Sequence, residues 1–182
     1  MEVRGLSFVL DEDVEALMRS MGDEDFSKDA TGVGLLWEPA TALLCDFLQT
    51  RAAALLREAS VLELGAGLGV AGMLCAKLGA SNVVLSDYHP VVLARLRSNV
   101  SLNFGSEPMC SVVELPWGEN TGCAHLHSLL IGADLAMTER AALKLAATAK
   151  AQLACDGAFL YAHQERRAVV LAADRSVSRE VS

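Results

Sequence analysis

After residue 40, short apolar runs alternate with longer segments in which apolar residues recur every three or four positions. Short apolar runs are typical of buried strands, and the three-to-four spacing is typical of helices that pack on a sheet. The predicted strands span 61–64, 82–86, 110–115, 129–134 and 158–162, and the predicted helices span 40–56, 68–78, 90–102 and 138–155. This alternation predicts an α/β fold with a doubly wound, mostly parallel sheet.

The first of these strands runs directly into a glycine-rich turn, Gly65-Ala66-Gly67-Leu68-Gly69. Clustered glycines let the backbone turn sharply and approach a ligand more closely than any side chain permits. The helix predicted at 68–78 begins there, so its unpaired N–H groups and the positive end of its dipole face the same place. The pattern predicts a site for a nucleotide-type cofactor with an anionic group.

The glycine spacing alone does not name the cofactor. Gly67, Gly69 and Gly72 fit both the G-x-G-x-x-G pattern of dinucleotide-binding proteins and a looser pattern of methyltransferases. The strand at 82–86 leads into Asp87, where a carboxylate can accept hydrogen bonds from both hydroxyls of a ribose. The alternative is that Asp87 only caps the helix that follows, which is a common role for Asp.

Length and composition indicate one domain. The chain has 182 residues, of which 52% are hydrophobic, and two independent cores are not expected at this size. Residues 1–30 hold nine acids and three bases, so they carry −6 of the formal net charge of −8. We therefore divide the chain into an acidic N-terminal segment, 1–30, and a cofactor-binding domain, 31–182. The negative charge disfavours nucleic acid and anionic membranes as partners.

The five cysteines and four histidines lack the paired spacing of metal sites, so no metal is expected. The N-terminus carries acids where a signal peptide has a basic start and an apolar core. No run of 18 residues is without charge and glycine, as a membrane span would require. The expected location is the cytoplasm, with the nucleus left open.

Six short motifs follow one another along the chain. They are Gly34-Leu35-Leu36-Trp37-Glu38-Pro39-Ala40, Val61-Leu62-Glu63-Leu64-Gly65-Ala66-Gly67, Leu85-Ser86-Asp87, Arg97-Ser98-Asn99-Val100-Ser101-Leu102-Asn103, Leu115-Pro116-Trp117-Gly118 and Ile131-Gly132-Ala133-Asp134. In this order they resemble the methyltransferase-like family of seven-strand (class I) protein lysine methyltransferases. The resemblance covers residues 31 to 167, and it implies a Rossmann-like form of the predicted sheet.

The resemblance also implies S-adenosylmethionine as the cofactor. The residues that it assigns to the cofactor are Trp37, Glu63, Gly65, Ala66, Gly67, Asp87, Trp117 and Ala133. The glycine turn would admit the methionine end against bare backbone, and Asp87 would hold the ribose hydroxyls. Trp37 and Trp117 would cover apolar parts of the cofactor, with a core position as the alternative for either, while Ala133 would keep the space near the adenine small.

The substrate end of the site is expected where the strand at 129–134 ends. Asp134 is the candidate for orienting the incoming lysine amine, with a structural cap as the alternative. The family has Asp-x-x-Tyr here, whereas this chain has Asp134-Leu135-Ala136-Met137. Met137 replaces an aromatic ring and its hydroxyl with a flexible thioether, so weak activity is expected.

The family continues after its fifth strand with a helix and an antiparallel pair of strands. We expect 164–182 to supply one helix but not two more strands, so that the sheet lacks the last family strands. An open sheet edge favours strand addition, and self-association of the chain through this edge is the expected consequence.

Three classes of function remain open. The first is a protein lysine methyltransferase acting on a protein substrate, the second is a weak or inactive pseudoenzyme that binds the cofactor, and the third is an NAD-dependent oxidoreductase. The ordered motifs disfavour the third class. The missing tyrosine favours the pseudoenzyme, but the intact cofactor motifs favour the enzyme, which is the function that we predict.

Overall fold

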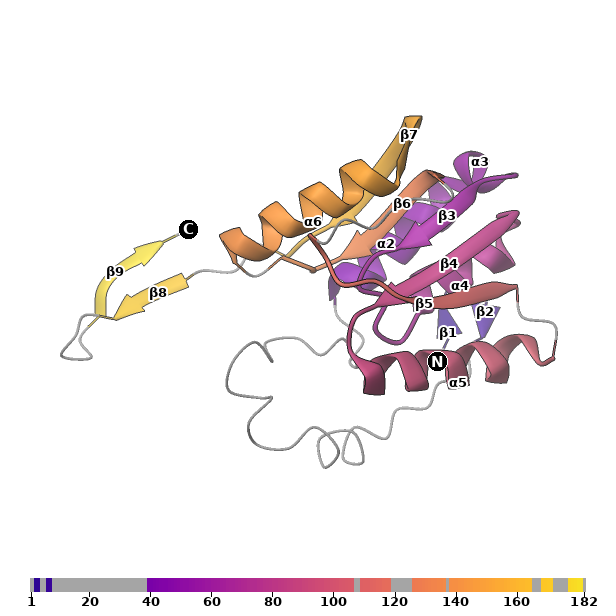
Figure 1. The fold of residues 1–182 in the computed structure, drawn as a ribbon, viewed down its shortest axis with the longest axis horizontal. Coiled ribbons are helices and arrows are strands. Elements are labelled where there is room, and N and C mark those ends of the chain that lie inside the picture. The colour runs from indigo at the N-terminus through magenta and orange to yellow at the C-terminus, as the bar shows by residue number, and fades with distance from the viewer. Residues whose placement is uncertain are drawn as a thin grey trace.

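The computed structural model describes residues 2–3, 6–7, 39–106, 109–118, 126–136, 138–164, 168–171 and 177–181. Five strands form one parallel sheet in the order β5-β4-β3-β6-β7 (Figure 1). Their bounds are β3 Ser60–Glu63, β4 Asn82–Asp87, β5 Cys110–Glu114, β6 His127–Ala133 and β7 Leu153–Ala162. The strand that comes first along the chain, β3, lies at the centre of this sheet. The chain adds β4 and β5 on one side and then β6 and β7 on the other, so the predicted doubly wound sheet is confirmed.

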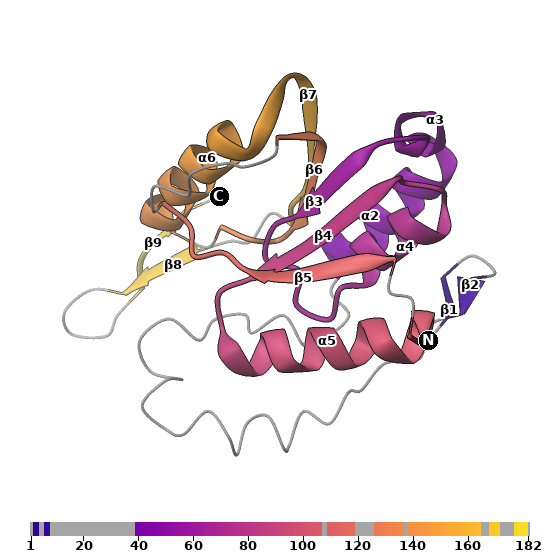
Figure 2. The same cartoon turned by 45° about the vertical axis from the view of Figure 1, so that its right-hand side comes forward.

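Five helices are described, namely α2 Pro39–Thr50, α3 Ala53–Leu56, α4 Val70–Lys77, α5 Pro90–Phe104 and α6 Glu139–Gln152. Figure 2 shows the sheet between α6 on one side and α4 and α5 on the other. Because side chains alternate along a strand, each central strand sends residues to two cores. Val61 and Ile131 join the core under α2, α4 and α5, whereas Leu62 and Leu130 join the core under α6.

Two predicted helices are wrong in extent. The helix predicted at 40–56 breaks after α2, because the N–H groups of Arg51 and Ala52 both donate to the Phe47 carbonyl and end the regular ladder. The helix predicted at 138–155 stops at Gln152, and the chain continues at once as β7. Pairing of β7 with β6 extends back to Leu153, so sheet formation overrides the helix propensity of this alanine-rich segment.

The prediction for the C-terminal segment is also wrong. In place of a helix, the structure has two strands, β8 Ala168–Leu171 and β9 Val177–Val181, which pair antiparallel. The run Ala168-Val169-Val170-Leu171 is rich in β-branched residues, which favour strands. These strands form a sheet of their own, as do the short β1 Glu2–Val3 and β2 Leu6–Ser7. Among the described residues, β7 pairs only with β6 and is therefore an edge strand.

In the part of the chain that the structure describes, no helix has both the length and the apolar character of a membrane span.

Candidate functional site

The glycine turn predicted from the sequence lies at the carboxyl end of the central strand β3. Gly65, Gly67 and Gly69 have φ values of 58°, 54° and 80°, which L side chains rarely adopt. The Ala66 N–H donates to the Ser86 carbonyl at 2.8 Å, which ties the turn to the neighbouring strand β4. Gly69 is the N-cap of α4, so the turn leads directly into that helix.

Trp117 lies against this turn, while its role as a cover of the cofactor stays a prediction. A Cβ atom at Gly65 would be 3.2 Å from Trp117 Cζ2 and 2.7 Å from Leu135 Cδ2. The three residues lie in the segments that follow three different strands, β3, β5 and β6. Trp117 also packs against the core under α6 and is half-buried, so the two interpretations of this tryptophan, cofactor cover and core residue, are compatible.

Asp87 ends β4 and joins that strand to the glycine turn. Its Oδ2 accepts a hydrogen bond from the Gly67 N–H at 3.3 Å, and its Oδ1 accepts from the N–H groups of Tyr88 and His89 at 2.8 and 3.1 Å. Burial raises the pKa of the Asp87 carboxyl, and the three N–H groups oppose that rise. The carboxylate supports the turn before α5. The N-cap of α5 is His89, so the interpretation of Asp87 as the helix cap is wrong.

Glu63 lies beneath the turn. Its carboxyl is buried, and Oε2 accepts a hydrogen bond from the Gly72 N–H at 2.9 Å, which holds the first turn of α4 on β3. Burial raises the pKa of Glu63 to about 8, the Gly72 hydrogen bond opposes the rise, and the charge of Asp87 adds to it. This contact supports the shape of the turn, while a direct contact of Glu63 with a cofactor stays a prediction.

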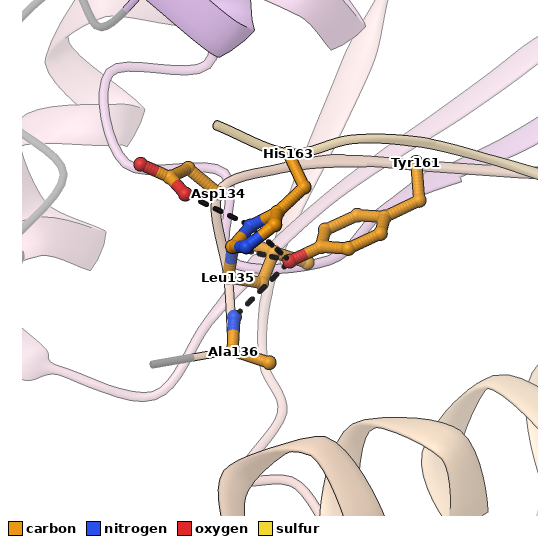
Figure 3. A network of polar contacts seen from close by, with 5 residues as sticks. All are labelled: Asp134, Leu135, Ala136, Tyr161 and His163. Carbon is orange, nitrogen blue, oxygen red and sulfur yellow. Dashed lines mark hydrogen bonds and ion pairs between the residues drawn. The ribbon is translucent and has the colours of Figure 1, made fainter. Parts of the chain in front are cut away.

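Asp134 follows β6 at the same edge of the sheet. Its φ is 52°, which is uncommon for a residue other than glycine. Its N–H donates to the Ala162 carbonyl at 2.8 Å, and its side chain is only 5% exposed. Oδ1 lies 3.1 Å from Nδ1 of His163, just after β7 (Figure 3). The sequence analysis did not identify His163.

The other assigned residues divide into two groups. Ala66 is buried within the turn, and Ala133 is the half-buried last residue of β6, paired with Ala162. Trp37 and Met137 lie outside the described residues.

The residues that the sequence analysis missed are Leu135, Tyr161 and His163. The alternation Phe159, Tyr161, His163 was the available signal, because residues two apart share one face of a strand.

Metal-binding residues do not cluster in the described ranges, where no three His, Cys, Asp or Glu residues are placed to hold an ion together.

A parallel sheet with a glycine turn after its central strand and an acid at the end of the neighbouring strand defines an α/β protein of the nucleotide-cofactor-binding class. The family model described as "Lysine methyltransferase" matches residues 23–173. This match covers most of the chain, and the chain belongs to that family.

The chain is 38% identical over 109 residues to Protein N-lysine methyltransferase METTL21A of Danio rerio, covering 58% of this chain and 48% of that protein. It is 32% identical over 108 residues to EEF1A lysine methyltransferase 3 of Mus musculus, covering 57% and 44%. The chain thus spans about half the length of these curated relatives.

Solved structures share the fold at low sequence identity. The glycopeptide N-methyltransferase MtfA complexed with sinefungin superposes with a TM-score of 0.57 at 19% identity, covering 80% of this chain and 67% of that one. The CcbJ methyltransferase from Streptomyces caelestis gives a TM-score of 0.53 at 21% identity, covering 67% and 47%.

Proposed function

We propose that this chain transfers a methyl group from S-adenosylmethionine to a lysine side chain of a protein substrate. The observation that carries the proposal is the hydrogen bond between Gly67 and Asp87, which holds the glycine turn and a carboxylate together at the carboxyl edge of the sheet. Ligands of such sheets bind at that edge. The family supports the reaction type, and the two relatives described above are named as lysine methyltransferases.

The residues around the glycine turn fit S-adenosylmethionine. A carboxylate has about four acceptor positions, and three N–H groups use the Asp87 carboxylate, so it retains capacity for a ribose hydroxyl. Trp117 and Leu135 lie so close to Gly65 that a Cβ there would clash with them, so the turn consists of bare backbone at this position. The N–H groups at the start of α4 would face the carboxylate of the methionine end.

S-adenosylmethionine would supply a methyl group already activated by a sulfonium, so no nucleophilic protein side chain is needed. The protein must align a neutral amine with that methyl group and exclude water. Asp134 is the proposed orienting residue, because its carboxylate is held at the end of the strand next to the glycine turn. The apolar side chains of Trp117 and Leu135 would favour the neutral amine over its charged form.

We propose a protein partner rather than nucleic acid or a membrane, in line with the net charge of −8. A protein with an accessible, basic lysine-containing segment is the kind of substrate that such a charge attracts. We also propose that the open edge of β7 lets two chains associate, since among the described residues this strand pairs on one side only.

The test is methyl transfer to a cell extract. The purified chain is incubated with S-adenosylmethionine carrying a labelled methyl group, and labelled proteins are separated and counted. Label on a protein, absent when the chain is omitted, is the expected result. Binding of the cofactor without transfer to any extract protein would instead indicate the inactive cofactor-binding alternative. Binding of NAD without S-adenosylmethionine would contradict the whole proposal.

A further inference from the structure

Three aromatic rings follow one another along the end of β7. Phe159, Tyr161 and His163 occupy alternate positions, so they lie on one face of the strand. The centroids of Phe159 and Tyr161 are 5.8 Å apart, as are those of Tyr161 and His163, and the latter two rings are stacked with planes 20° apart. Phe159 packs against the core under α6, so the rings extend from that core toward the candidate site.

The Tyr161 hydroxyl binds the backbone that follows Asp134. Its oxygen accepts hydrogen bonds from the N–H groups of Leu135 and Ala136, at 3.1 and 3.3 Å (Figure 3). A hydroxyl oxygen accepts about two hydrogen bonds, so this side chain holds two consecutive N–H groups of the segment after β6. Leu135 is the residue whose side chain lies against Gly65. The hydroxyl therefore fixes a segment that touches both ends of the candidate site.

His163 acts on the side chain of Asp134 itself. Its Nδ1 lies 3.1 Å from Oδ1 of Asp134 and 3.4 Å from the Tyr161 hydroxyl. Figure 3 shows the other carboxylate oxygen of Asp134 pointing away from the ring. A carboxylate that is 5% exposed requires a polar partner. The imidazole of His163, just after β7, lies at ion-pair distance from Oδ1, although the contact lacks the geometry of a hydrogen bond.

The backbone of Asp134 requires the same support. Its φ of 52° is sparsely populated for residues other than glycine, and such conformations persist where several contacts hold them. Three contacts come from one short stretch of chain: the Ala162 carbonyl accepts the Asp134 N–H, Tyr161 holds the next two N–H groups, and His163 meets the carboxylate. The end of β7 thus fixes both the backbone and the side chain of Asp134.

We propose that Tyr161 and His163 are positioning residues for methyl transfer, which hold Asp134 in the orientation that receives the substrate amine. This inference rests on the proposed function. The two residues act through Asp134 and take no part in bond making or breaking. Loss of either contact lets the carboxylate rotate, which lowers the turnover rate while the glycine turn and Asp87 still bind the cofactor.

The activity test compares Tyr161→Phe, His163→Ala and His163→Asn. Tyr161→Phe keeps the ring and removes the hydroxyl, whereas His163→Asn keeps a donor nitrogen at the place of Nδ1. The matched control is Asp156→Asn, an exposed position at the other end of the same strand.

We expect kcat to fall by about 10- to 100-fold in Tyr161→Phe and His163→Ala, because a small misplacement in an active site has effects of that size. His163→Asn restores most of the rate, and the affinity for S-adenosylmethionine is unchanged in all variants. Wild-type kcat in Tyr161→Phe and His163→Ala would overturn the inference, and so would equal losses in His163→Asn and His163→Ala, since only a bulk effect of the ring would then be at work.

A second measurement separates this inference from the proposed function. Amide hydrogen exchange of Leu135 and Ala136 is followed by NMR in the wild type and in Tyr161→Phe, with Asp156→Asn as the control. Loss of a hydrogen bond of ordinary strength accelerates exchange about fivefold. Unchanged exchange would overturn the inference even in an active enzyme. Faster exchange in Tyr161→Phe, together with a wild-type chain that transfers no methyl group, would overturn the proposed function and with it the role of these residues in transfer.

Discussion

The Asp87 carboxylate and the Gly67 N–H, which come from the ends of adjacent strands, are joined by a 3.3 Å hydrogen bond at the carboxyl edge of the sheet. This bond makes the acid part of the glycine turn, so a ligand seated on the turn meets the carboxylate as well. Gly67 and Asp87, which are 20 residues apart in the sequence (87 minus 67), therefore lie in contact in the folded chain.

Asp87→Ala should weaken binding of S-adenosylmethionine by about 1.5 to 3 kcal/mol, the usual contribution of a hydrogen bond to a charged group. Calorimetric titration of the wild type and the variant measures the difference, and titration with NAD tests cofactor choice in the same experiment. Asp156→Asn is the control for removal of an exposed acid from the sheet. Unchanged affinity for S-adenosylmethionine in Asp87→Ala would show that Asp87 does not bind the ribose.

Gly65→Ala should destabilise the fold and abolish cofactor binding, because its Cβ would collide with Leu135 and Trp117 at a backbone φ of 58°. Gly79→Ala is the matched control: its φ is 99°, but a Cβ there meets no atom within 4 Å. Urea unfolding should show a loss of about 1 to 3 kcal/mol in both variants from backbone strain. Only Gly65→Ala should lose binding of the cofactor. Equal affinities in the two variants would show that the close packing of Trp117 and Leu135 on Gly65 is not required for cofactor binding.

Glu63 should make the stability of the protein depend on pH. Its pKa is raised from 4.5 to about 8 in the folded chain, so between these values the folded chain holds a proton that the unfolded chain has lost. The contribution of this carboxyl is fully present below pH 4.5 and is lost as the pH rises through 8. Within that window each pH unit costs up to about 1.4 kcal/mol.

Glu63→Gln keeps an oxygen for the Gly72 N–H and removes the titration. Urea unfolding at pH 5.5 and pH 7.5, about two units apart within the window, should therefore show a smaller loss of stability in the variant than in the wild type. An identical pH dependence in the two proteins would mean that Glu63 does not hold a proton in the folded state.

Substitutions at the substrate end should alter turnover and spare cofactor affinity. Asp134→Ala should lower kcat by about 100-fold, as expected for a group that orients the reacting amine. Met137→Tyr should raise kcat, because it supplies the ring and hydroxyl of the Asp-x-x-Tyr pattern that the resemblance implies at this place. The measurement is steady-state methyl transfer with the cofactor dissociation constant determined in parallel. A Met137→Tyr variant that is neutral or slower would indicate that the amine is held differently in this chain.

The edge strand β7 should promote association of the chain. Light scattering after size-exclusion chromatography should give a concentration-dependent mass, and Ala158→Lys, a charge at an exposed position of the strand, should reduce it. The isolated chain should also have a low melting temperature, because an unpaired edge leaves the sheet incomplete. A monodisperse monomer with a high, cooperative transition would contradict this prediction.

The strands and the glycine turn were predictable because local patterns determine them. Alternation and short apolar runs locate the central strands, and positive φ values at Gly65 and Gly67 follow from a tight turn between a strand and a helix. The start of α5 at Pro90 and the Thr138 cap of α6, whose hydroxyl accepts the Ala141 N–H at 3.2 Å, also have local signals.

The partners of Asp134 were not predictable in the same way. Their position depends on the register of β7 against β6, which pairs Ala133 with Ala162 and thereby brings His163 beside Asp134. The register depends on contacts between segments that are distant in the sequence, so local patterns do not determine it. In addition, the high helix propensity of the preceding segment led us to predict helix where β7 begins. The alternating aromatic residues of β7 carried a signal, but only the sheet order shows that they lie beside the candidate site.

The most direct test of the central claim is mass spectrometry of extract proteins after incubation with the chain and S-adenosylmethionine with a heavy methyl group. The proposed function predicts heavy Nε-methyllysine in at least one protein with the wild type and with Asp156→Asn, and much less with Asp87→Ala at the same cofactor concentration. Heavy methyl groups only on residues other than lysine, or on none while calorimetry shows bound cofactor, would contradict the assignment as a protein lysine methyltransferase.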